Sequence, residues 1–234
     1  MKKLVIIPCY NEQETIMNVI ESVKKEKIDF IVVNDGSTDQ SKEILKKNKI
    51  PFLNLYNNLG IGGAMQTGYR YAYKNGYDIA IQVDGDGQHN AKYIKKLVEP
   101  IEKGEANIVI GSRFVGKKQG FRSSPMRRIG IGILSFLIYI ISKKRIKDTT
   151  SGFRAVDRAV IEKWAKHYPH EYPEPVTNLS MLKSGRKVIE VPVRMNPRMQ
   201  GYSSIRKWKA IYYMINVMIF FVIILVSIGD DLDA

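Results

Sequence analysis

The chain has 234 residues, of which 44% are hydrophobic and 26% charged, values that fit one globular domain and exclude a disordered chain or a multi-span membrane protein. Its formal net charge of +14 predicts an anionic partner, either nucleic acid, phospholipid head groups or phosphorylated small molecules, although excess lysine can also serve solubility alone. The only cysteine, Cys9, permits no disulfide within one chain and fits a reducing compartment. We expect no secretory signal, because two lysines lead directly into a short apolar run.

The first half of the chain alternates short apolar runs with amphipathic stretches. Residues 4–7 predict a strand, after which Asn11 is expected to cap a helix over 12–25 with Glu14 at the capping-box position. Residues 30–33 predict the second strand. Ser37 and Gln40 have capping-box spacing for a helix that ends near Lys47, so a strand–helix–strand repeat is indicated.

The same alternation continues through the next sixty residues. It predicts strands over 52–55, 79–83 and 108–110, and a helix that opens at 60–63 and ends near Gly76. This pattern favours an α/β fold with a mostly parallel sheet covered by helices on both faces. The polar clusters 10–12, 34–39 and 84–89 follow strands directly, so we expect them to converge at the carboxyl edge of the sheet.

A basic and apolar segment follows these strands. It contains no acidic residue but ten basic ones: Arg113, Lys117, Lys118, Arg122, Arg127, Arg128, Lys143, Lys144, Arg145 and Lys147. The apolar run 129–141 within it is too short to span a bilayer, which takes about 20 helical residues. We therefore expect 125–142 to form a helix lying in the membrane interface, with an ordinary buried helix as the alternative.

The last apolar segment, 211–228, is followed by three aspartates and preceded by three basic residues. It is just long enough to cross a thin bilayer, or it docks on the membrane or on a membrane partner. We divide the chain into a main domain, 1–205, and a C-terminal anchoring or docking helix, 206–234, with the main domain on the cytoplasmic face by the positive-inside rule. Asn216 is a candidate contact to a small membrane protein or to another copy of the chain.

The strongest chemical signal is the sequence Asp-Gly-Asp-Gly-Gln-His at 84–89, directly after a predicted strand. Asp84 and Asp86 present two carboxylates that can share a hard cation, Mg²⁺ or Mn²⁺. Gly85 lets the backbone approach a ligand closely. His89 is a further candidate ligand, although a histidine in a loop more often serves as a hydrogen-bonding residue, and the whole segment could also be an acidic turn.

Two other polar segments predict a nucleotide site. Asp35 can accept a hydrogen bond from a base or ribose, whereas Ser37 or Asp39 can instead cap the following helix. The glycine-rich stretch 57–64 opens a helix, which is a common place for an anion or nucleotide to bind. It matches neither the phosphate-binding loop of kinases nor the dinucleotide fingerprint of dehydrogenases.

Six motifs in order carry a resemblance to a known family. They are Pro-Cys-Tyr-Asn-Glu at 8–12, Asn-Asp-Gly-Ser-Thr-Asp at 34–39, Asn-Leu-Gly at 58–60, the motif at 84–89, Gly-Ser-Arg at 111–113 and Asp-Thr-Thr-Ser-Gly-Phe-Arg at 148–154. The chain resembles family 2 glycosyltransferases of the GT-A fold over about residues 4–205. It is most similar to the branch of dolichol-phosphate mannose synthase and bacterial polyprenyl-phosphate sugar transferases.

The resemblance implies a Rossmann-like GT-A sheet and a role for each matching residue. The nucleotide-sugar donor, a UDP-sugar by this resemblance, would be bound by Pro8, Tyr10, Asn11, Glu12, Asp35, Gly60, Gly62, Asp84 and Gly85. Asp86 and Gln88 would hold Mg²⁺ or Mn²⁺, and Arg113, Arg127 and Arg128 would act with Asp84 and Asp86 in catalysis. The acceptor phosphate would be bound by Arg127, Arg128, Arg198, Ser203 and Arg206.

A departure from the family favours a lipid phosphate as acceptor. Relatives that attack with a sugar hydroxyl carry an acidic base late in the domain, about where Val176 stands here, with Glu174 close by. A hydroxyl needs a base, whereas a phosphate oxygen is already anionic. We therefore expect an inverting transfer to polyprenyl (undecaprenyl) phosphate at the cytoplasmic face of the cell membrane, in cell-surface polysaccharide assembly.

Two alternatives stay open from the sequence. The enzyme could extend a lipid-linked saccharide at a sugar hydroxyl with Glu174 as base. A non-catalytic protein that binds RNA or anionic membranes would also explain the +14 charge. The sequence carries no helix-turn-helix and no basic sheet interleaved with aromatic residues, so we expect no nucleic-acid partner.

Overall fold

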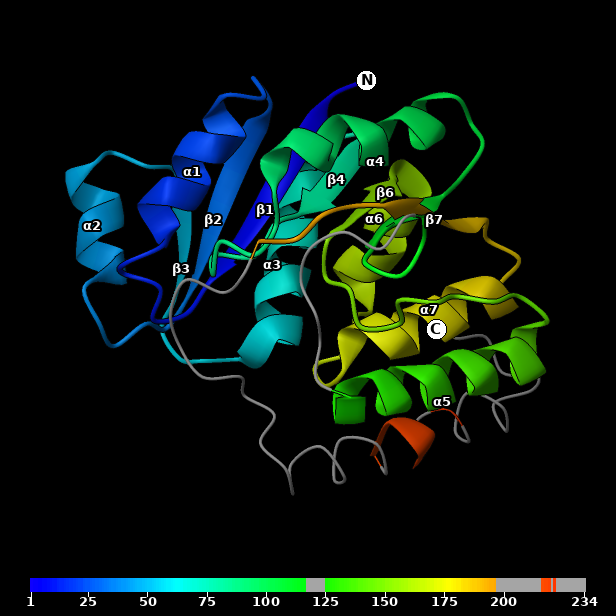
Figure 1. Cartoon of the computed structure of the whole chain (residues 1–234). Helices are drawn as coiled ribbons and strands as arrows, with labels where there is room; N and C mark the ends of the chain where they lie inside the picture. Colours follow the sequence, from blue (N-terminus) through cyan, green and yellow to red (C-terminus); the bar gives the residue numbers. More distant parts are fainter. Residues whose placement is uncertain (117–124, 197–215, 220, 222–234) are drawn as a thin grey trace.

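The computed structural model describes residues 1–116, 125–196, 216–219 and 221, and Figure 1 shows their arrangement. A sheet of seven strands occupies the centre, in the order β3-β2-β1-β4-β6-β5-β7. The strands are β1 (Lys3–Cys9), β2 (Asp29–Asp35), β3 (Phe52–Leu55), β4 (Ile79–Gln82), β5 (Ile108–Ser112), β6 (Arg154–Asp157) and β7 (Val188–Pro192). The helices are α1 (Ile16–Lys24), α2 (Ser41–Lys47), α3 (Gly60–Lys74), α4 (Ile94–Glu102), α5 (Pro125–Ser142), α6 (Arg158–Lys166) and α7 (Pro173–Lys183), with a short 3₁₀ turn η1 (Ala91–Tyr93).

The predicted α/β class with a mostly parallel sheet is confirmed. Strands β3, β2, β1 and β4 are parallel to one another, and β5 and β7 are parallel to each other. The exception is β6, which lies antiparallel between β4 and β5. Its four residues carry a charge at each end and no alternating pattern, which is why the sequence did not predict it.

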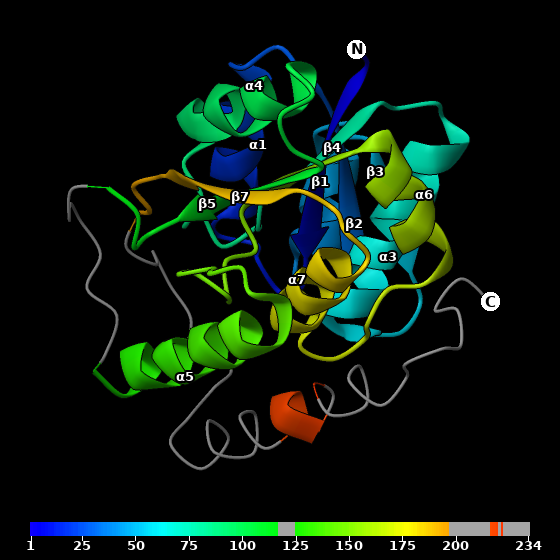
Figure 2. The ribbon, with the colours of Figure 1, turned by 90° about the vertical axis from the view of Figure 1, so that its right-hand side faces the viewer.

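Helices cover both faces of the sheet (Figure 2). Apolar side chains of the sheet are buried beneath them. On one face, residues of α1 and α4 pack with Val5, Ile7 and Cys9 of β1. On the other face, residues of α3 and α6 pack with Leu4 and Ile6 of the same strand. Because β1 is buried on both faces, it reads as a continuous apolar run instead of an alternating one.

Two predicted helix starts are wrong, and both corrections have the same cause. Helix α1 begins at Ile16, not at residue 12, and α2 begins at Ser41. Asn11 adopts a left-handed backbone conformation with φ of 54°, which cannot begin a helix. Its side chain and that of Ser37 bond to each other's loops, so neither of them caps the helix that follows it. Asn11 and Ser37 therefore form hydrogen bonds between the two loops and do not cap the helices.

Helix α5 has the bounds that the sequence predicted, 125–142. Leu134 and Ile138 on one face pack into a small cluster with α7, while Ile133 and Phe136 on the opposite face are exposed. Within the described residues, no helix combines the length and the apolarity needed to cross a bilayer. The predicted C-terminal helix falls mostly outside the described part of the chain, where only 216–219 and 221 are placed, as helix.

Candidate functional site

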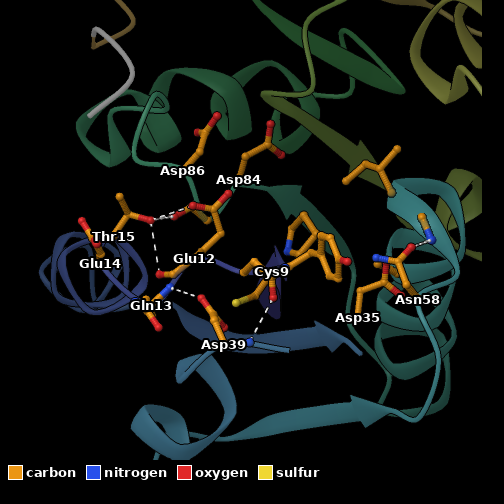
Figure 3. Close-up of a pocket in the computed structure, with 17 residues that line it drawn as sticks. Cys9, Glu12, Gln13, Glu14, Thr15, Asp35, Asp39, Asn58, Asp84 and Asp86 are labelled. Carbon is orange, nitrogen blue, oxygen red and sulfur yellow. Dashed lines mark hydrogen bonds between the residues drawn. The ribbon is translucent and has the colours of Figure 1, made fainter. Parts of the chain in front are cut away.

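A cavity of about 720 Å³ opens at the carboxyl ends of β1, β2 and β4, where the three polar clusters converge as expected (Figure 3). Parallel strands direct their carboxyl ends to one edge, so the loops after them meet there. Nine residues predicted to bind the donor or a metal line this cavity: Pro8, Tyr10, Asn11, Glu12, Asp35, Gly60, Asp84, Gly85 and Asp86.

The cavity is strongly acidic in spite of the basic composition of the chain. Six carboxylates line it, from Glu12, Glu14, Asp35, Asp39, Asp84 and Asp86, and among the described residues no lysine, arginine or histidine lines it. A diphosphate entering this site would meet these negative charges. A cation bound between the carboxylates and the diphosphate would favour its binding.

The loops after β1 and β2 are locked together beside the cavity. The side-chain oxygen of Asn11 accepts hydrogen bonds from the backbone N–H of Thr38, at 2.8 Å, and of Asp39, at 3.3 Å. In return, the Ser37 hydroxyl oxygen accepts a bond of 3.0 Å from the Asn11 N–H. These reciprocal bonds fix the wall of the cavity before any ligand arrives.

Asp35 joins the end of β2 to the start of α3. One carboxylate oxygen accepts a 2.8 Å hydrogen bond from the Leu59 N–H, so part of this side chain serves the helix terminus. Burial raises the pKa of Asp35, and hydrogen bonds from the backbone of Leu59 and Gly60 oppose that rise. Gly62 has a packing role, because a Cβ there would lie 2.3 Å from the carbonyl oxygen of Pro169, and it does not line the cavity.

Thr15 connects two walls of the cavity and was not predicted as a site residue. Its hydroxyl lies 2.7 Å from the carbonyl oxygen of Gly85 and 2.9 Å from a carboxylate oxygen of Glu12. The side chain is almost completely buried. It thereby ties the loop after β4 to the loop after β1, a contact across 70 residues that no local sequence pattern indicates.

Asp84 is held from three directions. The Gln82 amide donates a 3.0 Å hydrogen bond to one carboxylate oxygen, and the Asp84 N–H donates one of 3.0 Å to Nδ1 of His89. Gly152 lies directly against this side chain, since a Cβ there would stand 3.2 Å from the carboxylate. A larger residue at this position would push on the Asp84 carboxylate and on the Gln82 amide, 2.7 Å from such a Cβ.

His89 is buried behind Asp84 and stacks on Phe153 with ring centroids 4.8 Å apart. Burial lowers its pKa to about 4, with Asp86 acting in the opposite direction, so the imidazole is neutral at pH 7. Its Nδ1 already accepts the Asp84 N–H, and Nε2 lies 3.6 Å from the other carboxylate oxygen of Asp84. These contacts make His89 a support for Asp84.

Asp86 and its loop fit a divalent cation that completes its coordination from the substrate. Asp86 lines the cavity with Asp84, and one of its oxygens accepts a 3.0 Å bond from the Gln88 N–H. Among the described residues, no group of three or more His, Cys, Asp or Glu side chains could hold a metal. Mg²⁺ commonly binds through one or two carboxylates plus substrate phosphates and water. Asp84 and Asp86 could supply the two carboxylates of such a site.

Arg113, predicted as a phosphate ligand, forms an ion pair with Asp148. Its Nε and terminal nitrogen donate to the two oxygens of Asp148 at 2.8 and 2.7 Å, and the buried carboxylate also accepts the Arg113 N–H. Thr150 accepts a further bond from the guanidinium. Asp148 belongs to one of the six motifs that carry the family resemblance. Its pairing with Arg113, 35 residues away, was not predicted from the sequence.

Two more buried charges lie behind Asp84. Arg154 is fully buried, donates to the hydroxyls of Thr177 and Tyr168, and sits 4.8 Å from the ring centre of Trp164. Glu174 lies in the first turn of α7 and is half-buried. Burial raises the pKa of Glu174, while the nearby Arg154 lowers it.

None of the other predicted residues lines the cavity within the described part of the chain, and the side chain of Arg127 lies outside that part. Arg127 lies in the first turn of α5, and the next residue, Arg128, is exposed. Arg198, Ser203 and Arg206 lie outside the described residues. The described chain before them is tied to the acidic loop, because Asn196 donates to the carbonyl oxygens of Gln88, at 2.9 Å, and Gly87, at 3.2 Å.

Comparisons with known proteins agree with the resemblance seen in the sequence. The glycosyl transferase family 2 profile matches residues 4–165. A UDP-N-acetylglucosamine–dolichyl-phosphate N-acetylglucosaminyltransferase of Methanococcus voltae is 28% identical, over 97% of both chains. A polyprenol monophosphomannose synthase of Mycolicibacterium smegmatis is 27% identical, over 86% of this chain and 80% of the relative.

A solved structure shares the fold at lower sequence identity. Glucosyl-3-phosphoglycerate synthase of Mycobacterium tuberculosis, in complex with Mn²⁺, UDP and phosphoglyceric acid, superposes with a TM-score of 0.74. It is 18% identical, and the match covers 98% of this chain and 80% of that one. The likeness supports the GT-A-like fold of the seven-stranded sheet.

Proposed function

Because the chain belongs to glycosyl transferase family 2, we propose that this transferase moves a sugar from a UDP-sugar to the phosphate of a polyprenyl lipid such as undecaprenyl phosphate. The observation that carries the proposal is the acidic cavity in which Asp84 and Asp86 stand together at a strand end. The names of the relatives support it, since one includes a UDP-sugar and dolichyl phosphate and another a polyprenol phosphate sugar.

The donor would lie along the loops after β1, β2 and β4. Asp35 and the exposed ring of Tyr10 are placed to meet the base and ribose at one end of the cavity. Asp86, with Asp84 and Gln88, would hold Mg²⁺ or Mn²⁺ at the other end. The bound cation would supply charge neutralisation and Lewis acidity to the departing diphosphate.

The acceptor would react without a protein base. A phosphate oxygen of the lipid attacks the anomeric carbon as the bond from that carbon to the diphosphate oxygen breaks, so the anomeric configuration inverts. Val176, which the resemblance puts at about the position of the acid in hydroxyl-using relatives, is buried in the cluster between α5 and α7. A side chain at that position faces apolar neighbours and is unsuited to activate a hydroxyl.

The exposed face of α5 supports placement at a membrane surface. Ile129, Ile133, Phe136 and Ile140 are exposed along one side of this helix, at the spacing of an amphipathic stripe. The basic residues at both ends of α5 suit anionic head groups. We place the protein on the cytoplasmic face of the cell membrane, with the lipid tail in the bilayer and a small membrane protein or a second copy as a candidate partner, in cell-surface polysaccharide assembly.

A second candidate function rests on Glu174. Its pKa is raised by burial, and it is close enough to Asp84 and Arg113 for their charges to affect it. A carboxylate with a raised pKa is suited to take a proton from a hydroxyl. The enzyme would then extend a lipid-linked saccharide.

A transfer assay separates the two functions. Full-length protein in detergent, with Mn²⁺ or Mg²⁺, is given radiolabelled UDP- and GDP-sugars and undecaprenyl phosphate. We expect label to enter the lipid phase from a UDP-sugar and EDTA to stop it. Transfer only to a lipid-linked saccharide, lost in Glu174→Gln, would establish the second function. Sugar-nucleotide binding without transfer to any lipid would contradict both.

The membrane placement has its own test in vesicle cosedimentation. Ile133→Ser with Phe136→Ser removes two apolar side chains from the exposed face of α5, and we expect binding to anionic vesicles to fall by about tenfold or more, given roughly 1.5–3 kcal/mol for each buried side chain. Ser142 lies at the end of the same helix, and Ser142→Ala serves as the control. Equal vesicle binding by the double variant and by the Ser142→Ala control would show that α5 does not contact the membrane.

A further inference from the structure

A second cavity, of about 510 Å³, lies on the flank of the molecule between α3, α6 and α7, and it shares no lining residue with the acidic cavity. Five of its lining residues are basic: Arg70, Lys163, Lys166, His167 and His170. No carboxylate of the described residues lines it. As far as the structure describes the chain, the acidic cavity and this basic cavity therefore carry opposite charge.

The basic residues do not come from one helix. Lys163 and Lys166 lie in the last turn of α6, where cations also offset the helix dipole. Arg70 comes from α3, and the two histidines come from the segment before α7. The helix dipole accounts for the two lysines alone, so the convergence of the others needs another explanation.

The charged groups around this cavity are partly organised in advance. The Arg70 Nε–H donates a 3.0 Å bond to the carbonyl oxygen of Ala165, which holds the guanidinium beside the end of α6. Lys166 forms an ion pair of 3.2 Å with Glu162 one turn earlier. Both partners of that pair are largely exposed, so it is weak and an anionic ligand can compete for the lysine.

The floor of the cavity is apolar and aromatic. Trp164, Tyr168 and Met181 line it and are almost completely buried. The volume suits a small organic molecule, since ligand cavities in proteins run from about 300 to 1,000 Å³. Because these side chains are almost completely buried, the floor offers a small apolar contact surface, while the rim offers charge-assisted hydrogen bonds for an anion.

We propose that this basic cavity binds a phosphate-bearing organic ligand, with the phosphate at the rim and an apolar group against the floor. The proposal is independent of the reaction assigned to the acidic cavity. A phosphate here meets cations directly and needs no metal ion. The phosphate could belong to a soluble phosphomonoester or to a lipid head group, which present the same chemistry to the rim.

The test uses phenyl phosphate, which combines a phosphomonoester with an aromatic ring. Its binding to the full chain in detergent is measured by calorimetry with EDTA present, so that metal-dependent binding in the acidic cavity is absent. The test variant is Arg70→Gln with Lys166→Gln. The matched control is Lys25→Gln with Lys95→Gln, which removes two exposed lysines elsewhere.

We expect the test pair to weaken phenyl phosphate binding by at least about tenfold, because each rim cation contributes a charge-assisted bond, and the control pair to bind as the native protein does. No binding by the native protein, or equal loss in the two pairs, would overturn the proposal. Equal melting temperatures exclude unfolding as the cause of a difference.

A vesicle experiment then identifies the source of the phosphate. Vesicles of phosphatidylglycerol in phosphatidylcholine are offered to the same three proteins. A larger loss of vesicle binding in the test pair than in the control pair assigns the cavity to a lipid head group. Equal vesicle binding, with phenyl phosphate binding still lost in the test pair, assigns it to a soluble phosphate compound.

Discussion

The acidic cavity and the basic cavity show how one chain can present opposite charges to two anionic ligands. The acidic cavity is built from loops at the carboxyl edge of the sheet, whereas the basic cavity is built from helices on its flank. A net charge of +14 suggests direct binding of a diphosphate by lysine and arginine. In the proposed function, the carboxylates of the acidic cavity would instead bind a diphosphate through a divalent cation.

Arg154 lies between the two cavities. Its guanidinium is held by Thr177 and Tyr168, which line the basic cavity, and the charge of Asp84 in the acidic cavity acts on it. A buried cation is costly unless hydrogen-bonded and balanced by nearby charge. The acidic residues around Asp84 help to make a buried arginine tolerable at this position.

The largest expected effect is the loss of sugar transfer when a carboxylate of the acidic cavity is neutralised. Asp86→Asn keeps the size of the side chain but removes the charge that holds the cation, so we expect sugar transfer to fall by about a thousandfold. Glu14→Gln, which neutralises another carboxylate of the same cavity, should keep most of the activity. Equal rates in Asp86→Asn and the native protein would show that the cavity works without this carboxylate.

The next effect concerns the arginine beside the acidic cavity. Asp148→Asn leaves Arg113 without the buried partner that neutralises it, and we expect a loss of about 3 kcal/mol in the free energy of unfolding in urea. Glu99→Gln removes an exposed ion pair with Lys103 and should cause little measurable change. A loss no larger than in this control would mean that the pair contributes nothing to stability.

A smaller effect tests the link between two walls of the acidic cavity. Thr15→Val leaves the Gly85 carbonyl without its buried donor, which should lower the free energy of unfolding by about 1–3 kcal/mol and weaken donor binding. Thr15→Ser keeps the hydroxyl and should recover most of both. If serine and valine behave alike, the methyl group and not the hydroxyl matters.

The last effect is chemical and needs no mutation. Burial raises the pKa of Cys9 to about 12, a hydrogen bond with Ser41 opposes that rise, and Glu12 and Asp39 add to it. The thiolate is therefore scarce up to pH values near that pKa, and we expect iodoacetamide at pH 8 to modify native Cys9 roughly a thousandfold more slowly than the urea-unfolded chain. Similar rates would show that this wall of the cavity opens readily.

Much of the acidic cavity could be predicted because its parts are local. Strand 52–55 and helix 125–142 have the bounds that periodicity indicated. Asp84 and Asp86 follow a buried strand, and a parallel sheet brings such loops to one edge. Local capping was the weak point, since Asn11 and Ser37 bond across 26 residues to each other's loops.

The sequence by itself determined the α/β class, the family resemblance and the acidic residues at the strand ends, because periodicity and motifs depend on near neighbours. Only the tertiary structure decided the antiparallel place of β6, the pairing of Arg113 with Asp148 and the existence of the basic cavity. Gln66 of α3 donates to the carbonyl oxygen of Lys166, 100 residues away. Contacts over such separations depend on how the helices pack on the sheet. Packing depends on the shapes of several segments together, so no single segment of the sequence predicts it.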